Sequence, residues 1–448
     1  MLEKIRVIFT IPELRRKIFL TLVLLAIFRI GYHIDLPVVD SSQLDTQSQQ
    51  SQGALDSLLN QAAIFSASDL RQMTIFGLGI MPYISASIIF QLLASCWAPL
   101  EKLQKEGESG RKKINEYTRY ATIALCVFQS WFYLIAMSKM HQGFFLPQFC
   151  NEAGQLTLFW QFTAVFTMTC GTAFLMWLGE QIDAYGIGNG ISLLIMAGIL
   201  ARMPHPIIEL AAKFQKEGIQ VSGGETSVAS LVVLVALFVG VITGVVFITL
   251  GQRRIPSQSA KHVRGKRVYG GMRHYLPMKV NQAGVMPIIF ASSLLMIPAY
   301  LFHGFQGHQY LGWLYDMFSH DALFSYNAMY IALIFFFCYF WTAVTFNPKD
   351  MADNLKSNGT IIRGHRPGKQ TADYLEKVMI HITYVGAGFL AVVAIMPTLV
   401  ANYMHVNQDL ASFYGGTSLL IAVSVAFDLV QKIDSHLLMR NMKGLLEK

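Results

Sequence analysis

The sequence predicts an all-α integral membrane protein with ten transmembrane helices. Only 14% of its 448 residues are charged and 53% are hydrophobic, whereas a soluble domain carries about 25% charged residues. Apolar stretches long enough to cross a bilayer, about 20 residues each, recur along the whole chain. The basic residues are also distributed unequally between alternate loops, as expected of a membrane protein with a fixed orientation.

The predicted spans follow one another from near the start of the chain to near its end. They lie at 18–36, 74–97, 118–138, 156–178, 188–203, 229–250, 282–303, 326–346, 378–397 and 413–431. The fifth span is the shortest, and glycines 186, 188 and 190 lie at its start. An even number of spans places both termini on the same side of the membrane.

The basic residues predict which side that is. Of the 35 Lys and Arg residues, 29 fall in the segments on the side of the termini, five fall in the opposite loops, and Arg29 lies within the first span. Because positive charge is retained in the cytoplasm during insertion, both termini are predicted to be cytoplasmic. Loops 251–280 and 347–377 are then long, basic and cytoplasmic, either as ordinary positive-inside loops or as a docking surface for a cytosolic partner.

Between the first two spans lies a segment that is too polar for lipid. Residues 41–53 form a Gln/Ser-rich tract that predicts a flexible loop. Residues 54–71 have one apolar and one polar helical face. Such a helix lies either on the outer surface of the membrane or in a watery cavity lined by protein, because polar segments persist at membrane depth only there.

Other classes of protein are less consistent with the sequence. The chain contains no His-Glu-x-x-His, Gly-x-Ser-x-Gly or Walker motif, so it is not predicted to be an enzyme. The five cysteines at 96, 126, 150, 170 and 338 lack Cys-x-x-Cys spacing and are interpreted as small apolar core residues. The alternative is a secondary transporter of small solutes, but transporters usually carry intramembrane ionisable residues, and here these are chiefly Arg29 and Asp428.

Nine short motifs resemble signatures of the SecY family, and they occur in the order and spacing of that family. They are Gly77–Gln91, Lys105–Arg111, Gly179–Ser192, Gly251–Arg254, Leu276–Asn281, Phe346–Pro348, Ala352–Lys356, Arg366–Ala372 and Gly415–Ile421. The resemblance implies an hourglass channel built from two pseudo-symmetric five-helix halves, residues 1–203 and 229–448, joined by an external hinge loop at 204–228. It implies no cofactor and no metal.

The same resemblance implies a function and a set of partners. The channel would be the central subunit of the Sec protein translocase, a passive gated pore in the bacterial plasma (inner) membrane. It would move unfolded polypeptides across the membrane and release transmembrane segments laterally into the membrane lipid. The implied partners are small SecE-like and SecG-like membrane subunits, the SecA ATPase, the ribosome with its rRNA and proteins, and a nascent or unfolded polypeptide with a signal sequence.

The family's pore ring corresponds here to six isoleucines, Ile80, Ile84, Ile191, Ile195, Ile289 and Ile421. Residues four apart share a helix face, so each of the two pairs can point in one direction. An apolar constriction disfavours hydrated ions and can gate by dewetting. The segment at 54–71 would be the plug, and its implied residues are Leu58, Leu59, Asn60, Ala63, Ile64 and Phe65.

The second and seventh spans would line the lateral gate, with implied residues Ser85, Gln91, Asn281, Ser292 and Ser293. A buried amide is costly unless it is hydrogen-bonded. Gln91 and Asn281 would therefore either bond to each other across the closed gate or be satisfied by their own neighbours.

Three arginines match positions that engage the ribosome or SecA, namely Arg253, Arg254 and Arg366. The planar guanidinium pairs with phosphate and carboxylate alike. The sequence Arg366-Pro-Gly also predicts a tight turn that would present the arginine at a loop tip.

Overall fold

The computed structural model describes most of the chain, and its residues group by packing into two compact units. The described residues are 11–39, 73–140, 145–151, 156–202, 228–259, 262–264, 267–269, 273–303, 323–404 and 417–446, with the single positions 204, 208 and 212. One unit comprises Met1–His205 with Val425–Lys448, and the other comprises Pro206–Ser424. The predicted plug and the Gln/Ser tract lie outside the described residues.

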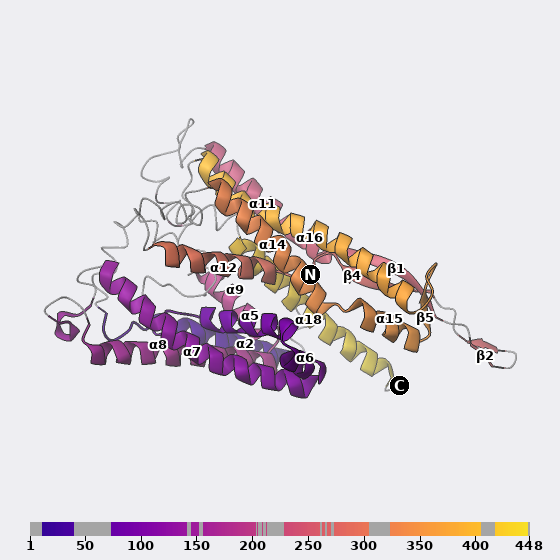
Figure 1. Ribbon diagram of the computed structural model, residues 1–448, viewed down its shortest axis with the longest axis horizontal. Helices are drawn as coiled ribbons and strands as arrows, with labels where there is room; N and C mark the ends of the chain where they lie inside the picture. Colours follow the sequence, from indigo (N-terminus) through magenta and orange to yellow (C-terminus); the bar gives the residue numbers. More distant parts are fainter. Residues whose placement is uncertain are drawn as a thin grey trace. The chain divides into compact units, whose positions relative to one another are not determined.

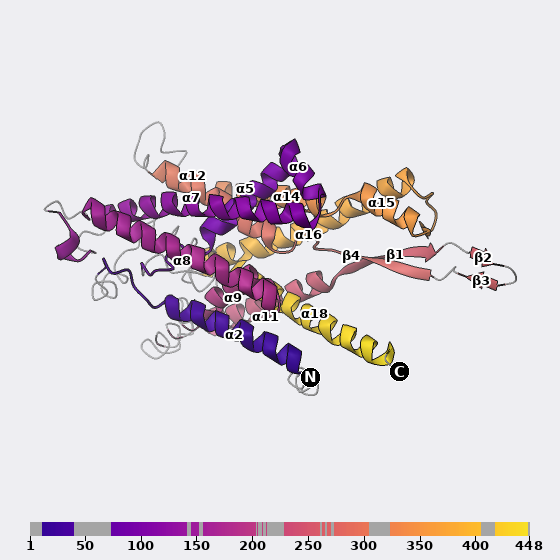
Figure 2. The ribbon, with the colours of Figure 1, turned by 90° about the horizontal axis from the view of Figure 1, so that it is seen from below.

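The first unit consists of helices packed along their length. They are α2 (Pro12–Gly31), α5 (Met81–Cys96), α6 (Ala98–Lys105), α7 (Glu108–Met140), α8 (Leu158–Tyr185) and α9 (Gly190–Arg202), with a short 3₁₀ turn, η1 (Pro147–Phe149). Helix α7 packs against α5 and α8, and α2 packs against α8 and α9. Figures 1 and 2 both show α7 and α8 running side by side.

The second unit combines helices with a small sheet. Its helices are α11 (Val228–Leu250), α12 (Met286–His303), α14 (Leu323–Thr345), α15 (Pro348–Ser357) and α16 (Lys369–Met404). Helix α14 packs against α12 and α16, and α15 packs against α16. Helix α18 (Thr417–Leu446) begins in this unit, and from Val425 onward its residues belong to the first unit.

Each of the ten predicted spans overlaps a helix in the described residues. Leu158–Tyr185, Phe324–Ser357 and Lys369–Met396 are long and apolar enough to cross a membrane, with mean hydropathy of 1.4, 1.9 and 2.1 over 18 residues. Met81–Ala94 and Ala98–Gln104 meet the same test only together and are bent by 102°. The fold is therefore that of an all-α membrane protein.

The predicted boundaries of the first two spans were wrong. The first helix begins at Pro12 rather than at 18 and ends at Gly31 rather than at 36. A proline suits the first turn of a helix because its missing N–H has no helical partner there, and the basic residues that follow Pro12 are helical as well. The second helix begins at Met81 rather than at 74, because turns occupy the preceding residues and Gly79 has a φ of 54°.

The two predicted cytoplasmic loops of the second unit fold together, which the sequence analysis missed. Loop 251–280 supplies β1 (Gln252–Ser259) and β4 (Arg273–Lys279), and loop 347–377 supplies β5 (Thr360–Ile362). The strands form an antiparallel sheet in the order β4-β1-β5. Strands β2 (His262–Arg264) and β3 (Arg267–Tyr269) pair in a hairpin at the far end of β1 and β4 (Figure 2).

A hydrophobic core holds this sheet against α16. Ile255, Ile362 and Leu375 are 1%, 2% and 0% exposed, and they cluster with four further apolar residues. The other members of the cluster are Met278, Phe346, Val378 and Ile382. The strands contribute only one or two inward side chains each, so neither loop contains the continuous apolar stretch that would have indicated a core.

The helices themselves expose large apolar side chains. On α8 the exposed side includes Phe159, Phe162 and Phe166, whereas its buried side combines small residues such as Gly171 with aliphatic residues such as Leu175. Exposed apolar surface on this scale is typical of contact with lipid or a membrane partner. Of the five cysteines, 126 and 338 are buried and 150 is half-buried, but 96 and 170 are exposed, so the core interpretation was wrong for those two.

Candidate functional site

Four of the six predicted ring isoleucines lie in the first unit. Ile80 is the N-cap of α5 and Ile84 lies in its first turn, and they are 2% and 6% exposed. The Ile84 N–H donates to the Ile80 carbonyl oxygen at 3.0 Å, so the two side chains are one helical turn apart. Ile191 and Ile195 lie on α9, where Ile195 is 4% exposed and Ile191 is half-buried.

The other two ring isoleucines lie in the second unit and are also buried. Ile289 is 3% exposed near the start of α12, and Ile421 is 1% exposed near the start of α18. All six residues therefore lie at a helix start or within two turns of it, and all except the half-buried Ile191 are buried. Their assembly into one ring stays a prediction.

The predicted plug lies outside the described residues, but the backbone on either side of residues 40–72 is fixed. The Leu36 N–H donates to the Met73 carbonyl oxygen at 3.0 Å, and the Ile75 N–H donates to the Ile34 carbonyl oxygen at 3.0 Å. These bonds form an antiparallel bridge beside α2 and α5. The two ends of the intervening segment are thereby held next to each other.

The gate amides each donate a hydrogen bond within their own segment. Gln91 Nε2 donates to Ser87 Oγ at 3.1 Å, and Asn281 Nδ2 donates to the Gly284 carbonyl oxygen at 3.0 Å. The Gln91 Oε1 atom is buried without a hydrogen-bond partner in the described residues, which is unfavourable for a polar atom. Each amide thus donates to a near neighbour, but these neighbours do not satisfy Gln91 Oε1. Which of the two alternatives holds stays a prediction.

The predicted gate serines differ in how they are placed. Ser85 is half-buried in the first turns of α5. Ser292 Oγ donates to the Ile289 carbonyl oxygen at 2.9 Å, so its hydroxyl is satisfied within α12. The side chain of Ser293 lies outside the described part of the structure.

The three predicted docking arginines are exposed on the folded region that contains the sheet. Arg253 and Arg254 lie on β1, paired with Met278 and Pro277 of β4. Arg366 lies in the turn before α16. Their basic side chains therefore face solvent on a structured surface.

The turn at Arg366 is fixed by hydrogen bonds from the start of α16. Thr371 Oγ1 donates to the Arg366 carbonyl oxygen at 2.8 Å, and the Arg366 N–H donates to Gln370 Oε1 at 3.4 Å. Gly368 has a φ of 105°, a left-handed conformation that favours glycine. The His365 ring stacks on Tyr374 with centroids 4.2 Å apart, which anchors the preceding residue.

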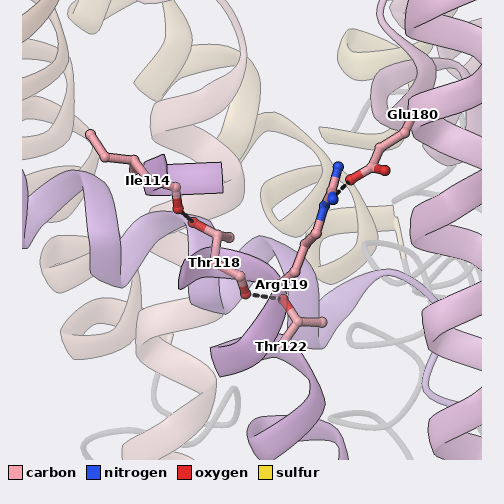
Figure 3. A network of polar contacts seen from close by, with 5 residues as sticks. All are labelled: Ile114, Thr118, Arg119, Thr122 and Glu180. Carbon is pink, nitrogen blue, oxygen red and sulfur yellow. Dashed lines mark hydrogen bonds and ion pairs between the residues drawn. The ribbon is translucent and has the colours of Figure 1, made fainter. Parts of the chain in front are cut away.

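An interhelical ion pair in the first unit was missed by the sequence analysis. Arg119 Nε on α7 lies 2.7 Å from Glu180 Oε1 on α8 (Figure 3). Beside it, Thr118 donates to the Ile114 carbonyl oxygen and Thr122 to that of Thr118. The sequence analysis placed Glu180 in a loop, but α8 continues to Tyr185. Like charges three residues apart, as in Glu180 and Asp183, disfavour a helix, so the local sequence carries no signal for this extra helical turn.

The fold and these residues define a polytopic helical membrane protein with isoleucines at its helix starts and a basic region that is folded around a small sheet. A family model described as SecY matches residues 74–430. Protein translocase subunits SecY of Streptomyces scabiei, Pseudomonas aeruginosa and Escherichia coli K12 are 42%, 41% and 40% identical to this chain. The alignments cover 98%, 97% and 97% of this chain and 98%, 92% and 94% of the relatives. The chain therefore belongs to the SecY family.

Solved structures agree with the fold of that family. A structure described as a protein-conducting channel has a TM-score of 0.63 and 20% identity, with 96% of each chain covered. Sec61 in a canine ribosome-channel complex has a TM-score of 0.60 and 17% identity, also with 96% of each chain covered. SecY proteins are multi-pass proteins of the bacterial inner membrane, and the family consists of channels rather than enzymes.

Proposed function

We infer that this chain is the channel subunit of a Sec protein translocase, a passive gated pore for unfolded polypeptides. Identity of about 40% to SecY subunits over nearly the full chain carries this inference. The burial of five of the six isoleucines, in a protein that exposes many other large apolar side chains, supports their role as a pore ring.

The proposed ring works through the chemistry of aliphatic side chains. Isoleucine offers no ligand to replace the water that an ion would lose, so a narrow isoleucine ring excludes hydrated ions. It makes no directional bond to a passing chain either, so it accommodates a polypeptide of any sequence. The energy for movement then comes from a partner and not from this subunit.

The lateral gate would open between the second and seventh spans, here α5 and α12. The buried Oε1 of Gln91 has an unused capacity to accept a hydrogen bond. An N–H of the Asn281 amide would donate a hydrogen bond to this oxygen in the closed gate, and that bond would break when the gate opens. Signal sequences and transmembrane segments would leave through this gate into the lipid.

Partners would meet the channel at its cytoplasmic face. The exposed Arg253, Arg254 and Arg366 suit the phosphates of rRNA and the carboxylates of SecA. Because the backbone that carries these arginines is held by the sheet and the turn, less conformational entropy is lost when a partner docks. Small SecE-like and SecG-like subunits would bind the helices within the membrane, and both termini would be cytoplasmic.

The pore ring is tested by replacing Ile84, Ile195 and Ile289 with serine in the purified complex reconstituted in liposomes. We expect the closed channel to leak ions, because serine hydroxyls offer ligands to ions and keep the constriction wet. The matched control replaces three exposed isoleucines, Ile27, Ile89 and Ile380, which are 38%, 45% and 45% exposed. A triple ring variant as ion-tight as this control would rule out the ring.

The docking role of Arg366 is tested by the substitution Arg366→Glu. We expect export to fall about tenfold, as for the loss of a hydrogen bond to a charged partner, while the protein itself inserts normally. Arg363→Glu makes the same change of charge at an exposed neighbour in the same turn. Equal export by the two variants would remove Arg366 from the docking surface.

A further inference from the structure

The connection between α8 and α9, residues 186–189, is held by side chains from two different helices. Asp183 Oδ1 on α8 accepts a hydrogen bond from the Gly190 N–H at 2.7 Å. Thr21 Oγ1 on α2 accepts from the Ile187 N–H at 3.2 Å, across 166 residues of sequence. The Thr21 hydroxyl donates its own hydrogen to the Lys17 carbonyl oxygen at 2.9 Å, which orients its lone pairs toward the connection.

These bonds lie where the backbones are in direct contact. A Cβ on Gly190 would collide with the carbonyl oxygen of Gly179 on α8. A Cβ on Gly186 would lie 2.6 Å from Thr21 Oγ1 and 2.7 Å from the Ile182 carbonyl oxygen. The connection therefore packs directly against both helices, and a shift at the start of α9 has little room to be absorbed nearby.

The two N–H groups differ in how far their acceptors are from the surface. Thr21 and Ile187 are 7% and 3% exposed, whereas Gly190 is buried but its acceptor Asp183 is exposed. An N–H that loses its acceptor in such a position is left with an unfavourable buried polar group. Asn189 Oδ1 completes the arrangement by accepting from the Ser192 N–H at 3.1 Å, and the Asp183 carboxylate adds a favourable charge at the N-terminus of α9.

We propose that Thr21 and Asp183 are positioning residues that fix the start of α9 and thereby hold Ile191 and Ile195 in the pore ring. Ile191 directly follows Gly190, and Ile195 lies about one turn further along the same helix. Gly179 also faces Ile191, since a Cβ on the glycine would lie 3.2 Å from Ile191 Cγ1. The effect of this positioning on gating rests on the proposed function. The placement of α9 can be measured independently of that function.

The first experiment measures the placement of α9. In the full-length protein, with its five natural cysteines replaced by serine, Ile195→Cys is labelled with a water-soluble maleimide in liposomes. Asp183→Leu removes the acceptor for the Gly190 N–H, and we expect the labelling rate to rise about tenfold. Asp183→Asn retains an amide oxygen in the same place and should label at the rate of the parent protein.

Thr21 provides a second variant, which keeps the proposal testable if Asp183→Leu does not fold. Thr21→Val has nearly the same shape but no hydroxyl, and we expect a smaller rise in labelling because the bond to Ile187 is the longer one. Thr21→Ser retains the hydroxyl and should restore the parent rate. Labelling rates that are the same in the acceptor-free and the acceptor-retaining variants would overturn the proposal.

The second experiment separates the positioning role from the pore ring by measuring ion leak in liposomes of variants that do not carry Ile195→Cys. We expect Asp183→Leu to leak and Asp183→Asn to remain tight, with Ile195→Ser as the comparison for a damaged ring. If Ile195→Ser leaks and Asp183→Leu does not, the positioning proposal is wrong and the ring stands. If labelling rises in Asp183→Leu while Ile195→Ser stays ion-tight, α9 is positioned as proposed and the ring is wrong.

Discussion

Helix α8 and the sheet of β4, β1 and β5 both bury aliphatic side chains but expose opposite kinds of side chain. Helix α8 exposes Phe159, Phe162 and Phe166, at 69%, 62% and 71%, and buries Leu175 and Leu178 together with smaller residues against its neighbours. The sheet exposes Arg253 and its other basic residues and buries its branched aliphatic side chains in a closed core.

This difference indicates which solvent, lipid or water, surrounds each part of the chain. Lipid is as apolar as leucine, so helices in a membrane associate through close packing of small residues and not through the hydrophobic effect. The sheet lies where water drives apolar side chains together. One chain therefore contains two cores that follow different rules, and substitutions should affect them differently.

The largest effect is expected in the core of the sheet. Leu375→Ala removes a side chain that is 0% exposed, and a buried truncation of this kind costs about 2–5 kcal/mol. We expect the region that contains the sheet to become sensitive to limited proteolysis while the membrane helices stay intact. Ile361→Ala, at a residue of β5 that is 40% exposed, is the control. Equal protease resistance of both variants would show that this core does not hold the region together.

A second prediction compares the two solvents directly with one type of substitution. Phe166 on α8 and Tyr275 on β4 are similarly exposed, at 71% and 63%. Lysine at position 166 faces lipid and should impair membrane insertion, at a cost of about 2.5–3.5 kcal/mol near the centre of a span. Tyr275→Lys should have almost no effect on insertion. If both variants insert equally well, the outward face of α8 does not contact lipid.

The smallest effect is expected for the ion pair between α7 and α8. The side chains of Arg119 and Glu180 are 46% and 32% exposed, so their attraction is partly screened. A double-mutant cycle with Arg119→Ala and Glu180→Ala should give a coupling of about 0.2–1 kcal/mol in the free energy of unfolding. A coupling well above that range would show that the pair is desolvated by lipid or by a partner.

The helices were predictable because each one carries its own signal. Apolar stretches of sufficient length located ten predicted spans without reference to any contact, and each span overlaps a helix among the described residues. Their ends were less predictable, since Pro12 and the turn at Gly79 moved the first two helix starts by several residues. The sheet was not predicted at all, because β1 and β5 come from loops that are about a hundred residues apart in sequence.

The candidate site, like the fold, could be predicted from the sequence only in part. Its residues could be named from motifs in the sequence, and the turn at Arg366 could be expected from its Pro-Gly dipeptide. The anchoring of that turn by Thr371, and the hydrogen bond of Gln91 to Ser87, depend on side-chain geometry. Motif patterns contain no information about which of several nearby acceptors a donor will use.

The sequence by itself determined that this protein lies in a membrane, because hydropathy is summed along the chain and needs no folding. The side on which its basic residues lie stays a prediction. Only the tertiary structure decided that two distant loops share one core, and that Thr21 bonds to a backbone amide 166 residues away. Those contacts form between segments that are distant in sequence, and no local pattern specifies which segments meet.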